Sequence, residues 1–353
     1  MSNNYSEIFQ THANYNHFIL SQSSLIIKYK KLQNQNAENL ELKWNLMIWD
    51  FGKKRQFLEQ FNDIHGNYYI VATDFSGLTC LFNSYDKSEY FITVVCDLAQ
   101  VNKHICPILI HPKLPGVILA NFKNGFMQSP TYISKNNGKK FEIIQYDSNQ
   151  RDCRNGFCDI KLNLPCRVLN KYHFPKEWII FATGMFIKNE QFSMFVTFDG
   201  GQIWKSVPSS DSTVRTLNDG GIIANVDKLT NNLFYSFDEG KTYHNMSINK
   251  EDEVILGAFS FGITKNLRLM VLGRDAIEST LIITNIDFKS LLKRSCERHD
   301  YTLWSLTRSS GNCYQGQETV YWKKNITSMC FENPTYSSNI KNTCPCYLED
   351  FQW

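Results

Sequence analysis

The sequence lacks a strong charge of either sign and lacks long apolar runs. Its 353 residues include 37 Lys and Arg against 34 Asp and Glu, a formal net charge of +3 at pH 7. Because this excess is small and the basic clusters are as short as Lys28–Lys31, nucleic acid is not expected as a partner. No run of roughly eighteen apolar residues occurs, so no segment is expected to span a membrane as a helix. No secretory signal is evident near Phe18 either, because no basic start precedes a clean apolar stretch.

The sequence also has few of the cysteine spacings that bind metals. Zinc sites usually contain pairs of the Cys-x-x-Cys type, whereas this chain offers only Cys344-Pro345-Cys346 and the pair Cys296 and His299. We therefore expect no metal and no other cofactor. A total of 11 cysteines is nevertheless high, and it is typical of a disulfide-rich protein made in an oxidising compartment. Five of them fall in the last sixth of the chain: Cys296, Cys313, Cys330, Cys344 and Cys346.

What the sequence does contain is a turn pattern, Ser/Thr-x-Asp-x-Gly-x-x-aromatic, which occurs in full at Thr197–Trp204 and Ser236–Tyr243. A third copy, Ser134–Phe141, has Asn in place of Asp, and a weaker fourth copy, Ser84–Phe91, has Ser88 in place of Gly. This is the Asp-box pattern of β-propeller blades, and its repetition in order indicates that fold. The residues expected to build these turns are Ser134, Asn136 and Gly138, then Thr197, Asp199, Gly201 and Trp204, then Ser236, Asp238, Gly240 and Tyr243.

The chemistry of the Asp box predicts a structural role. Its carboxylate is expected to accept N–H groups of its own hairpin, its glycine supplies a backbone angle that other residues resist, and its aromatic packs beneath the turn. We therefore interpret Asp86, Asp199 and Asp238 as residues that hold turns and not as catalysts. Apolar runs that open with glycine, Gly116–Ala120 and Gly220–Ala224, are predicted to be buried strands.

The four copies begin 50, 63 and 39 residues apart. A four-stranded blade needs about 40 to 50 residues, so the long interval predicts an insertion, which we place at Asp152–Cys158. The fold expected is all-β: an Asp-box propeller of about five or six blades in residues 1–290, followed by a small disulfide-rich module in residues 291–353. Sequons at Asn245 and Asn325 predict glycosylation on a lumenal surface.

The order of residues in the tail is more specific than its composition. The segments Cys296–Trp304, Gly311–Gly316, Tyr321–Lys324 and Cys344–Phe351 follow one another. Together with Asp219–Ala224 upstream, they resemble the sortilin family of vacuolar protein sorting receptors, where the propeller meets paired cysteine-rich modules. The resemblance implies a ten-bladed ring. Because only about five or six blades are counted, we expect a partial sequence, a wrongly assembled gene or a decayed paralogue.

The resemblance also implies how the cysteines pair. It joins Cys296 to Cys330, Cys313 to Cys344 and Cys153 to Cys158, and it gives Cys346 a partner beyond the end of this chain. For the remaining cysteines, buried free thiols and disulfides are equally expected. These are Cys80, Cys96, Cys106 and Cys166.

By this resemblance, the chain is the lumenal, cargo-binding part of a sorting receptor for transport from the Golgi to the endosome, vacuole or lysosome. Protein or peptide cargo is expected to bind in the propeller tunnel against exposed strand backbone. Two alternatives stay open: a decoy or non-functional fragment, and a sialidase-like Asp-box glycoside hydrolase. The hydrolase would need an arginine cluster and an acid and nucleophile pair, which the sequence does not offer, so we expect no enzyme activity.

Overall fold

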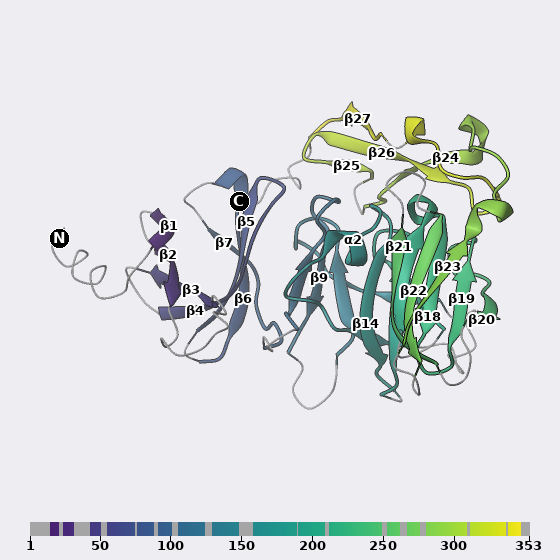
Figure 1. Cartoon of the computed structure of the whole chain (residues 1–353). Helices are drawn as coiled ribbons and strands as arrows, with labels where there is room; N and C mark the ends of the chain where they lie inside the picture. Colours follow the sequence, from purple (N-terminus) through teal and green to yellow (C-terminus); the bar gives the residue numbers. More distant parts are fainter. Residues whose placement is uncertain are drawn as a thin grey trace. The chain divides into compact units, whose positions relative to one another are not determined.

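The computed structural model describes residues 15–346 (Figure 1), of which residues 15–59 are described by their backbone alone. Its gaps are residues 21–23, 32–42, 51–54, 75, 88–90, 101–104, 124–128, 148–157, 189, 209–211, 249–252, 262–266, 276–279, 309–310 and 337. The chain forms two compact units, Met1–Ile108 with Ala120–Met127, and Leu109–Leu119 with Gln128–Trp353.

The first unit contains a seven-stranded antiparallel sheet in which each strand pairs with the next along the chain. Tyr69–Ala72 and Leu81 are buried in it, as expected for strands rich in β-branched and aromatic residues. A disulfide joins Cys80 to Cys96, with sulfurs 2.03 Å apart. The strands are β1 (Tyr15–Leu20), β2 (Ser24–Lys31), β3 (Lys43–Asp50), β4 (Arg55–Ile64), β5 (Asn67–Asp74), β6 (Thr79–Ser84) and β7 (Ile92–Val95), and the turn η1 (Tyr85–Lys87) follows β6.

Four successive antiparallel sheets follow, in the meander order of propeller blades. The first holds β8 (Ile108–Ile110), β9 (Ile118–Asn121), β10 (Thr131–Ser134) and β11 (Glu142–Ile143). The second holds β13 (Ile160–Leu162), β14 (Ile180–Phe186), β15 (Phe192–Thr197) and β16 (Ile203–Val207), with β12 (Gln145–Tyr146) parallel to β16. The third holds β17 (Ser212–Leu217), β18 (Ile222–Asp227), β19 (Asn232–Ser236) and β20 (His244–Ser247), and the fourth holds β21 (Glu253–Phe261), β22 (Arg268–Asp275) and β23 (Leu281–Asp287).

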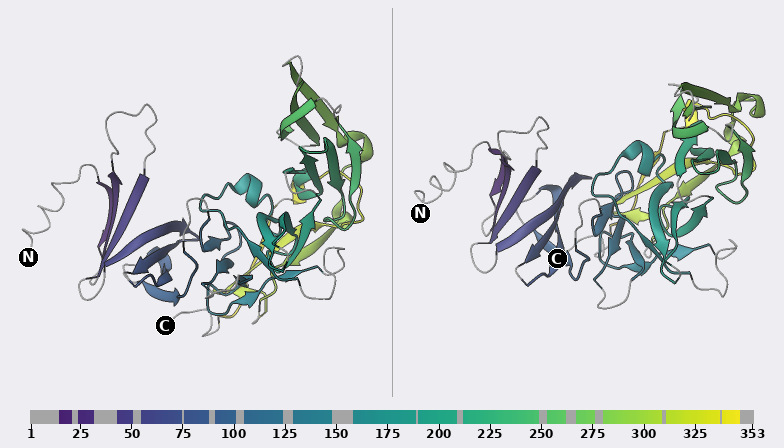
Figure 2. Two further views of the ribbon diagram at one scale, coloured as in Figure 1. Left: turned by 90° about the horizontal axis from the view of Figure 1, so that it is seen from below. Right: turned by 60° about the horizontal axis from the view of Figure 1, so that its bottom comes forward.

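These sheets confirm the predicted all-β propeller fold. Two of them contain the predicted glycine-led runs as fully buried second strands, β9 and β18. The first strands of the last two sheets, β17 and β21, lie side by side (Figure 2). Apolar side chains fill the space between neighbouring sheets: Phe195 and Trp204 belong to one buried cluster, and Val226 and Val271 belong to the next. The number of blades stays a prediction.

The long interval between the second and third Asp boxes has a source that the sequence did not reveal. Between β13 and β14 the chain makes an extended connection that contains the short helix α2 (Asn170–His173) and buries Phe174 and Trp178 in the core. The predicted insertion at Asp152–Cys158 lies almost entirely outside the described residues. The connection through α2 therefore accounts for part of the extra length.

The last part of the chain is a small module built around one long strand (Figure 1). That strand, β26 (Gln317–Lys324), pairs with β24 (Tyr301–Ser305), β25 (Cys313–Tyr314) and β27 (Ile340–Thr343). The turns η3 (Phe288–Leu291), η4 (Arg298–Asp300) and η5 (Pro334–Tyr336) complete it. The module lies against the ends of the blades of the same unit, where their Asp-box turns are.

Candidate functional site

The Asp-box turn at Thr197 connects β15 to β16 and satisfies its own polar groups. The Thr197 hydroxyl donates to Asp199 Oδ1 at 2.7 Å, and the same oxygen accepts the backbone N–H of Gln202 at 2.9 Å. Gly201 adopts a φ of +114°, and a Cβ there would lie 2.9 Å from Ile133 Cδ1. Trp204 is fully buried and its indole N–H donates to the Gly201 carbonyl at 2.7 Å. The glycine and the aromatic are thus required by the shape of the turn.

The turn at Ser236 repeats this geometry between β19 and β20. The Ser236 hydroxyl donates to Asp238 Oδ1 at 2.8 Å and accepts the N–H of Gly240 at 2.9 Å. Thr242 donates both its N–H and its hydroxyl to the Asp238 carboxylate. Burial alone would raise the pKa of Asp238, but these donors outweigh it and hold the pKa below its usual value. Tyr243 packs its ring against the core, and burial raises the pKa of its hydroxyl.

The Asn-containing copy forms the same turn between β10 and β11. Asn136 Oδ1 takes the place of the carboxylate oxygen: it accepts from the Ser134 hydroxyl at 2.9 Å and from the N–H of Lys140 at 3.0 Å. Gly138 donates its N–H to the Ser134 hydroxyl at 2.8 Å. An amide can therefore replace the carboxylate, because the turn needs an acceptor and not a charge.

The weak fourth copy, Ser84–Phe91, is described only in part. Asp86 lies in the 3-10 turn after β6 with a φ of +48°, and its backbone N–H donates to Asn67 Oδ1 at 3.0 Å. The residue at the glycine position of the pattern, Ser88, lies outside the described residues. Asp86 thus lies in a turn that contacts β5, and the bonds expected of its carboxylate stay a prediction, because residues 88–90 lie outside the described residues.

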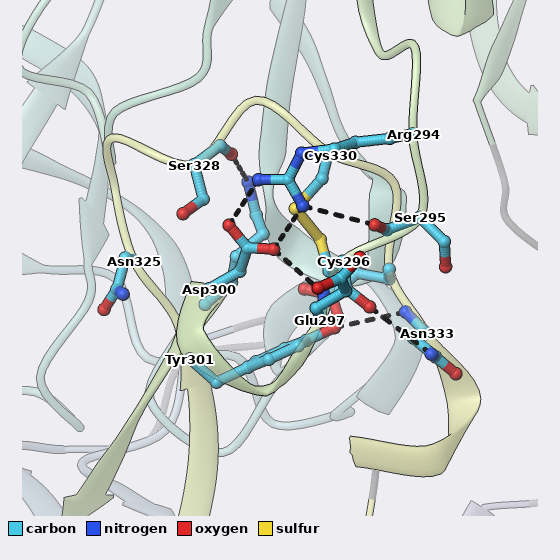
Figure 3. The surroundings of a disulfide bond; sticks show 12 residues. Arg294, Ser295, Cys296, Glu297, Asp300, Tyr301, Asn325, Ser328, Cys330 and Asn333 are labelled. Carbon is cyan, nitrogen blue, oxygen red and sulfur yellow. Dashed lines mark hydrogen bonds and ion pairs between the residues drawn. A yellow bond between two sulfur atoms is a disulfide. The ribbon is translucent and has the colours of Figure 1, made fainter.

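Inside the module, a disulfide lies beside an ion pair between an exposed arginine and a buried aspartate (Figure 3). Cys296 and Cys330 are bonded at 1.99 Å and both are fully buried. Beside them Arg294 donates two hydrogen bonds to Asp300, one of them at 2.7 Å, and the N–H of Glu297 donates to the same carboxylate at 2.9 Å. The bonds from Arg294 are the main reason that the pKa of Asp300 falls well below its usual value.

This corner is also a cluster of possible metal ligands, because Cys296, Asp300 and Cys330 place their ligand atoms within 4.8 Å of one another. The two sulfurs form a disulfide and so cannot act as thiolates, and the carboxylate is bonded to Arg294. This cluster is therefore a disulfide with a neighbouring ion pair and not a metal site.

A second disulfide of the module joins Cys313 to Cys344 at 2.05 Å. Cys346 is a free, exposed thiol. Cys106, Cys158 and Cys166 are also disulfide-bonded. The open question about Cys80, Cys96, Cys106 and Cys166 is thereby decided in favour of disulfides. Cys153 lies outside the described residues, so its pairing with Cys158 stays a prediction.

The module contacts the Asp-box turns of three neighbouring sheets. Lys323 donates to the Phe198 carbonyl at 2.7 Å and forms an ion pair with Glu239 at 2.9 Å, which links the two full Asp-box turns. Arg308 donates to the carbonyl of Lys135 in the Asn-containing turn, and to the Pro115 carbonyl at 2.8 Å. The Asp-box face of the propeller is thus the surface on which the module is held.

A further contact comes from the turn η2 (Asn218–Gly220), before β18. Asn218 adopts a φ of +51°, donates its amide to the Cys330 carbonyl at 3.0 Å and accepts the N–H of Glu332 at 2.7 Å. A Cβ on Gly221 would lie 2.6 Å from Lys324 Cε. Sequence reasoning noticed this glycine-rich segment but did not predict its contact with the module. The signal was the adjacent pair of glycines, which marks a close approach.

A cationic side chain lies on the side of the sheets that is formed by their first strands, such as β17 and β21; we call this the first-strand side. Arg215 on β17 lies with its guanidinium carbon 4.7 Å from the Tyr172 ring and 5.8 Å from the Phe259 ring. Burial lowers its pKa. Among the described residues, its Nε finds no hydrogen-bond acceptor, although it is shielded from solvent. A half-buried cation stacked on two aromatic rings is suited to binding a carboxylate or a carbonyl.

The two sequons differ in their surroundings. Asn245 lies on the exposed edge strand β20. Asn325 lies in the module, where its amide donates to the His299 carbonyl at 3.2 Å and its N–H donates to the Asp300 carbonyl at 2.8 Å. Within the described residues, no helix is long and apolar enough to cross a membrane.

Two family models match the sequence in the order that the structure presents. The model described as "Sortilin, neurotensin receptor 3" matches residues 81–257, half of the chain, and the model described as its C-terminal part matches residues 263–352. The chain belongs to the sortilin family. The first match ends at residue 257 and the second begins at residue 263, so the change from one model to the other falls within the last sheet. The predicted domain boundary at residue 290 stays a prediction.

Members of the sortilin family among the curated proteins include named sorting receptors. The human VPS10 domain-containing receptor SorCS1 is 25% identical over 257 residues, which cover 67% of this chain and 22% of the receptor. The vacuolar protein sorting/targeting protein 10 of Fusarium vanettenii is 24% identical over 351 residues, which cover 84% of this chain and 23% of that protein. The chain therefore spans about a fifth of the length of these relatives.

Solved structures with a similar fold are more distant from this sortilin-family chain. Hsv2 of Kluyvelomyces marxianus is 12% identical with a TM-score of 0.33, covering 87% of this chain and 88% of that one. The GH74 enzyme of Niastella koreensis is 9% identical with a TM-score of 0.22, covering 87% of this chain and 59% of that one. Neither likeness is close enough to support a functional argument.

Proposed function

We propose that this chain is the lumenal, cargo-binding part of a sorting receptor that carries proteins from the Golgi to the endosome and the vacuole or lysosome. The observation that carries the proposal is the ordered match to both sortilin-family models. The disulfides of the module support a lumenal location, because such bonds form and persist in oxidising compartments. The named function of the relatives supports the transport role.

We place the cargo contact on the first-strand side of the blades. There β17 and β21 lie side by side, and Arg215 presents a cation between two aromatic rings. An extended peptide can pair with exposed strand backbone while its carboxylate meets the guanidinium. The three box acceptors Asp199, Asp238 and Asn136 are not proposed as contacts, because they bond their own turns.

We infer that the chain is not an enzyme. The carboxylates of the two full Asp boxes are engaged within their own turns, where they accept backbone N–H groups. The donors around Asp238 lower the pKa of its carboxyl, which makes it a poor general acid. The receptor relatives point in the same direction.

A chimeric receptor tests the proposal. Residues 81–352 replace the matching segment of the vacuolar protein sorting/targeting protein 10 of Fusarium vanettenii in a strain that lacks its own copy, and the fraction of vacuolar hydrolase that is secreted is measured. Retention of the hydrolase is the expected result. Secretion as high as in the deletion strain, by a chimera that is folded and correctly located, would contradict the proposal. Binding of the hydrolase without retention would indicate the decoy alternative.

Arg215→Gln in the same chimera tests the contact itself. The substitution should raise secretion toward the deletion level while leaving the amount of folded chimera unchanged. Arg268→Gln is the matched control, because Arg268 is exposed and pairs with Asp287 on the fourth sheet. An equal effect of both substitutions would refute the assignment of Arg215 without touching the receptor proposal.

A further inference from the structure

A cavity of about 220 Å³ opens where the Asn-containing turn meets the module. Three of the side chains that line it are cationic, Lys135, Lys140 and Arg308, and one is a carboxylate, Glu142. Lys135, Lys140 and Glu142 come from the turn between β10 and β11 and from β11 itself, and Arg308 comes from the module. The cavity is therefore on the Asp-box face and not on the side where cargo is proposed to bind.

The cavity is lined by more cationic than anionic side chains. Lys140 and Glu142 form an ion pair at 2.8 Å and neutralise each other. Lys135 is half-buried, and among the described residues no carboxylate forms an ion pair with it. Burial lowers its pKa despite the attraction of Asp199 and Glu142, and the nearby Arg308 lowers it further. Two like charges are thus held near each other at the edge of a protected space.

One of these cations is fixed in place before any ligand arrives. The Arg308 guanidinium donates to the main-chain carbonyls of Lys135 and Pro115 and lies 4.4 Å from the Tyr314 ring. A guanidinium keeps its charge at neutral pH, and one that is already held by several contacts loses little freedom when an anion binds. The volume corresponds to several water molecules at about 30 Å³ each. It can therefore hold one small oxyanion with part of its hydration shell.

We propose that this cavity binds an oxyanion, a carboxylate or a sulfate, between Lys135 of the propeller and Arg308 of the module. Both cations line the cavity, so an anion with two or more oxygens can contact both. Because Lys135 and Arg308 belong to different parts of the chain, the bound anion joins the module to the blades. An anion that binds only the folded chain also stabilises it by mass action.

Calorimetric titration of the full chain tests the site, with ionic strength kept constant by exchange against chloride. Inorganic sulfate is the ligand in one arm, and N-acetylglutamate is the ligand in the other. Lys135→Gln should raise the dissociation constant about tenfold, since a charge-assisted hydrogen bond is lost. Lys139→Gln is the matched control: it removes one exposed cation from the same turn without lining the cavity, and it should change the constant less than about twofold.

Glu142→Gln provides a second, opposite test. Removing this carboxylate frees Lys140 and takes away a repulsive charge, so the dissociation constant should fall. Sulfate binding alone would identify a free inorganic anion as the ligand, whereas binding in both arms would identify a carboxylate group as well. Equal constants for the unaltered chain and Lys135→Gln, or no heat of binding in either arm, would overturn the proposal. So would a Glu142→Gln variant that binds more weakly.

Discussion

At the scale of single residues, acidic side chains of the Asp-box face and of the module stabilise local structure by accepting hydrogen bonds. Asp199 and Asp238 accept the N–H groups of their own turns, and Asp300 accepts from Arg294 and from the main chain at Glu297. At Asp238 and Asp300 these donors favour the charged form of the carboxylate and lower its pKa. These two residues therefore stabilise the fold at neutral pH and are poor sources of protons.

The pair Arg294 and Asp300 gives the fold a defined acid sensitivity. The pKa of Asp300 is lowered in the folded chain, so its contribution is complete above the ordinary aspartate pKa of about 4 and is lost as the pH falls through the lower folded value. Asp300→Asn should lower the free energy of unfolding by about 1–2 kcal/mol at pH 7. It should also flatten the loss of stability below pH 4. Urea unfolding at a series of pH values measures both effects.

The exposed pair Arg268 and Asp287 is the control for this measurement. It lies on the surface of the fourth sheet, and Asp287→Asn should change stability by less than about 1 kcal/mol. A loss as large as that of Asp300→Asn would mean that burial beside the disulfide does not matter.

The two sequons make a separate prediction at this scale. Asn245 is exposed on an edge strand, whereas the amide of Asn325 is bonded to His299 in the module. In cells that secrete the chain, Asn245→Gln should therefore remove one glycan, seen as a mobility shift that glycosidase treatment abolishes. Asn325→Gln should produce a smaller mobility shift, or none, because little or no glycan is expected at Asn325. Full occupancy at Asn325 and none at Asn245 would contradict this ranking.

At the scale of elements, the Asp-box turns could be predicted because all their determinants lie within eight residues. Acceptor, glycine and aromatic are each read directly from the sequence, and the structure uses them between the third and fourth strands of three sheets. The connection that contains α2 could not be predicted, because its burial depends on Phe174 and Trp178 finding a core built by distant strands.

Substitutions at Asp199 test the interpretation that the Asp-box turn needs a hydrogen-bond acceptor and not a charge. The Asn-containing copy shows that an amide oxygen makes the same bonds. Asp199→Asn should therefore cost less than about 1 kcal/mol of stability, whereas Asp199→Ala leaves partly buried N–H groups without this acceptor and should cost more, about 1–2 kcal/mol. Thermal unfolding of both variants gives the comparison. Equal losses would indicate that the charge, and not the acceptor, holds the turn.

At the scale of the whole molecule, the attachment of the module to the blades is the feature that sequence reasoning could not reach. Asn218 contacts the Cys330 carbonyl 112 residues away, and Lys323 contacts Phe198 at a separation of 125. The adjacent glycines beside Asn218 mark a close approach, but nothing in the local sequence identifies the partner. The disulfides within the module were accessible from the family resemblance, because their spacing is part of its pattern.

Loss of these contacts should loosen the module without unfolding the blades. Lys323→Met removes the link between two Asp-box turns, and hydrogen exchange in β24 and β26 should become at least several-fold faster. Exchange in β18 should stay unchanged. Lys293→Met is the control, because Lys293 is exposed and outside this contact surface. Equal acceleration in β18 would mean that module and blades unfold as one unit.

The short strand β12 follows β11 in sequence but pairs in parallel with β16 of the next sheet. Gln145 and Asp147 donate their N–H groups to the carbonyls of Gln202 and Trp204, across the boundary between the two sheets. The segment between successive Asp boxes is therefore offset from the folded blade. A recombination that exchanges one such segment also replaces the outer edge of its neighbour, so exchangeable cassettes in this propeller must be cut after β11, which keeps β12 together with β16.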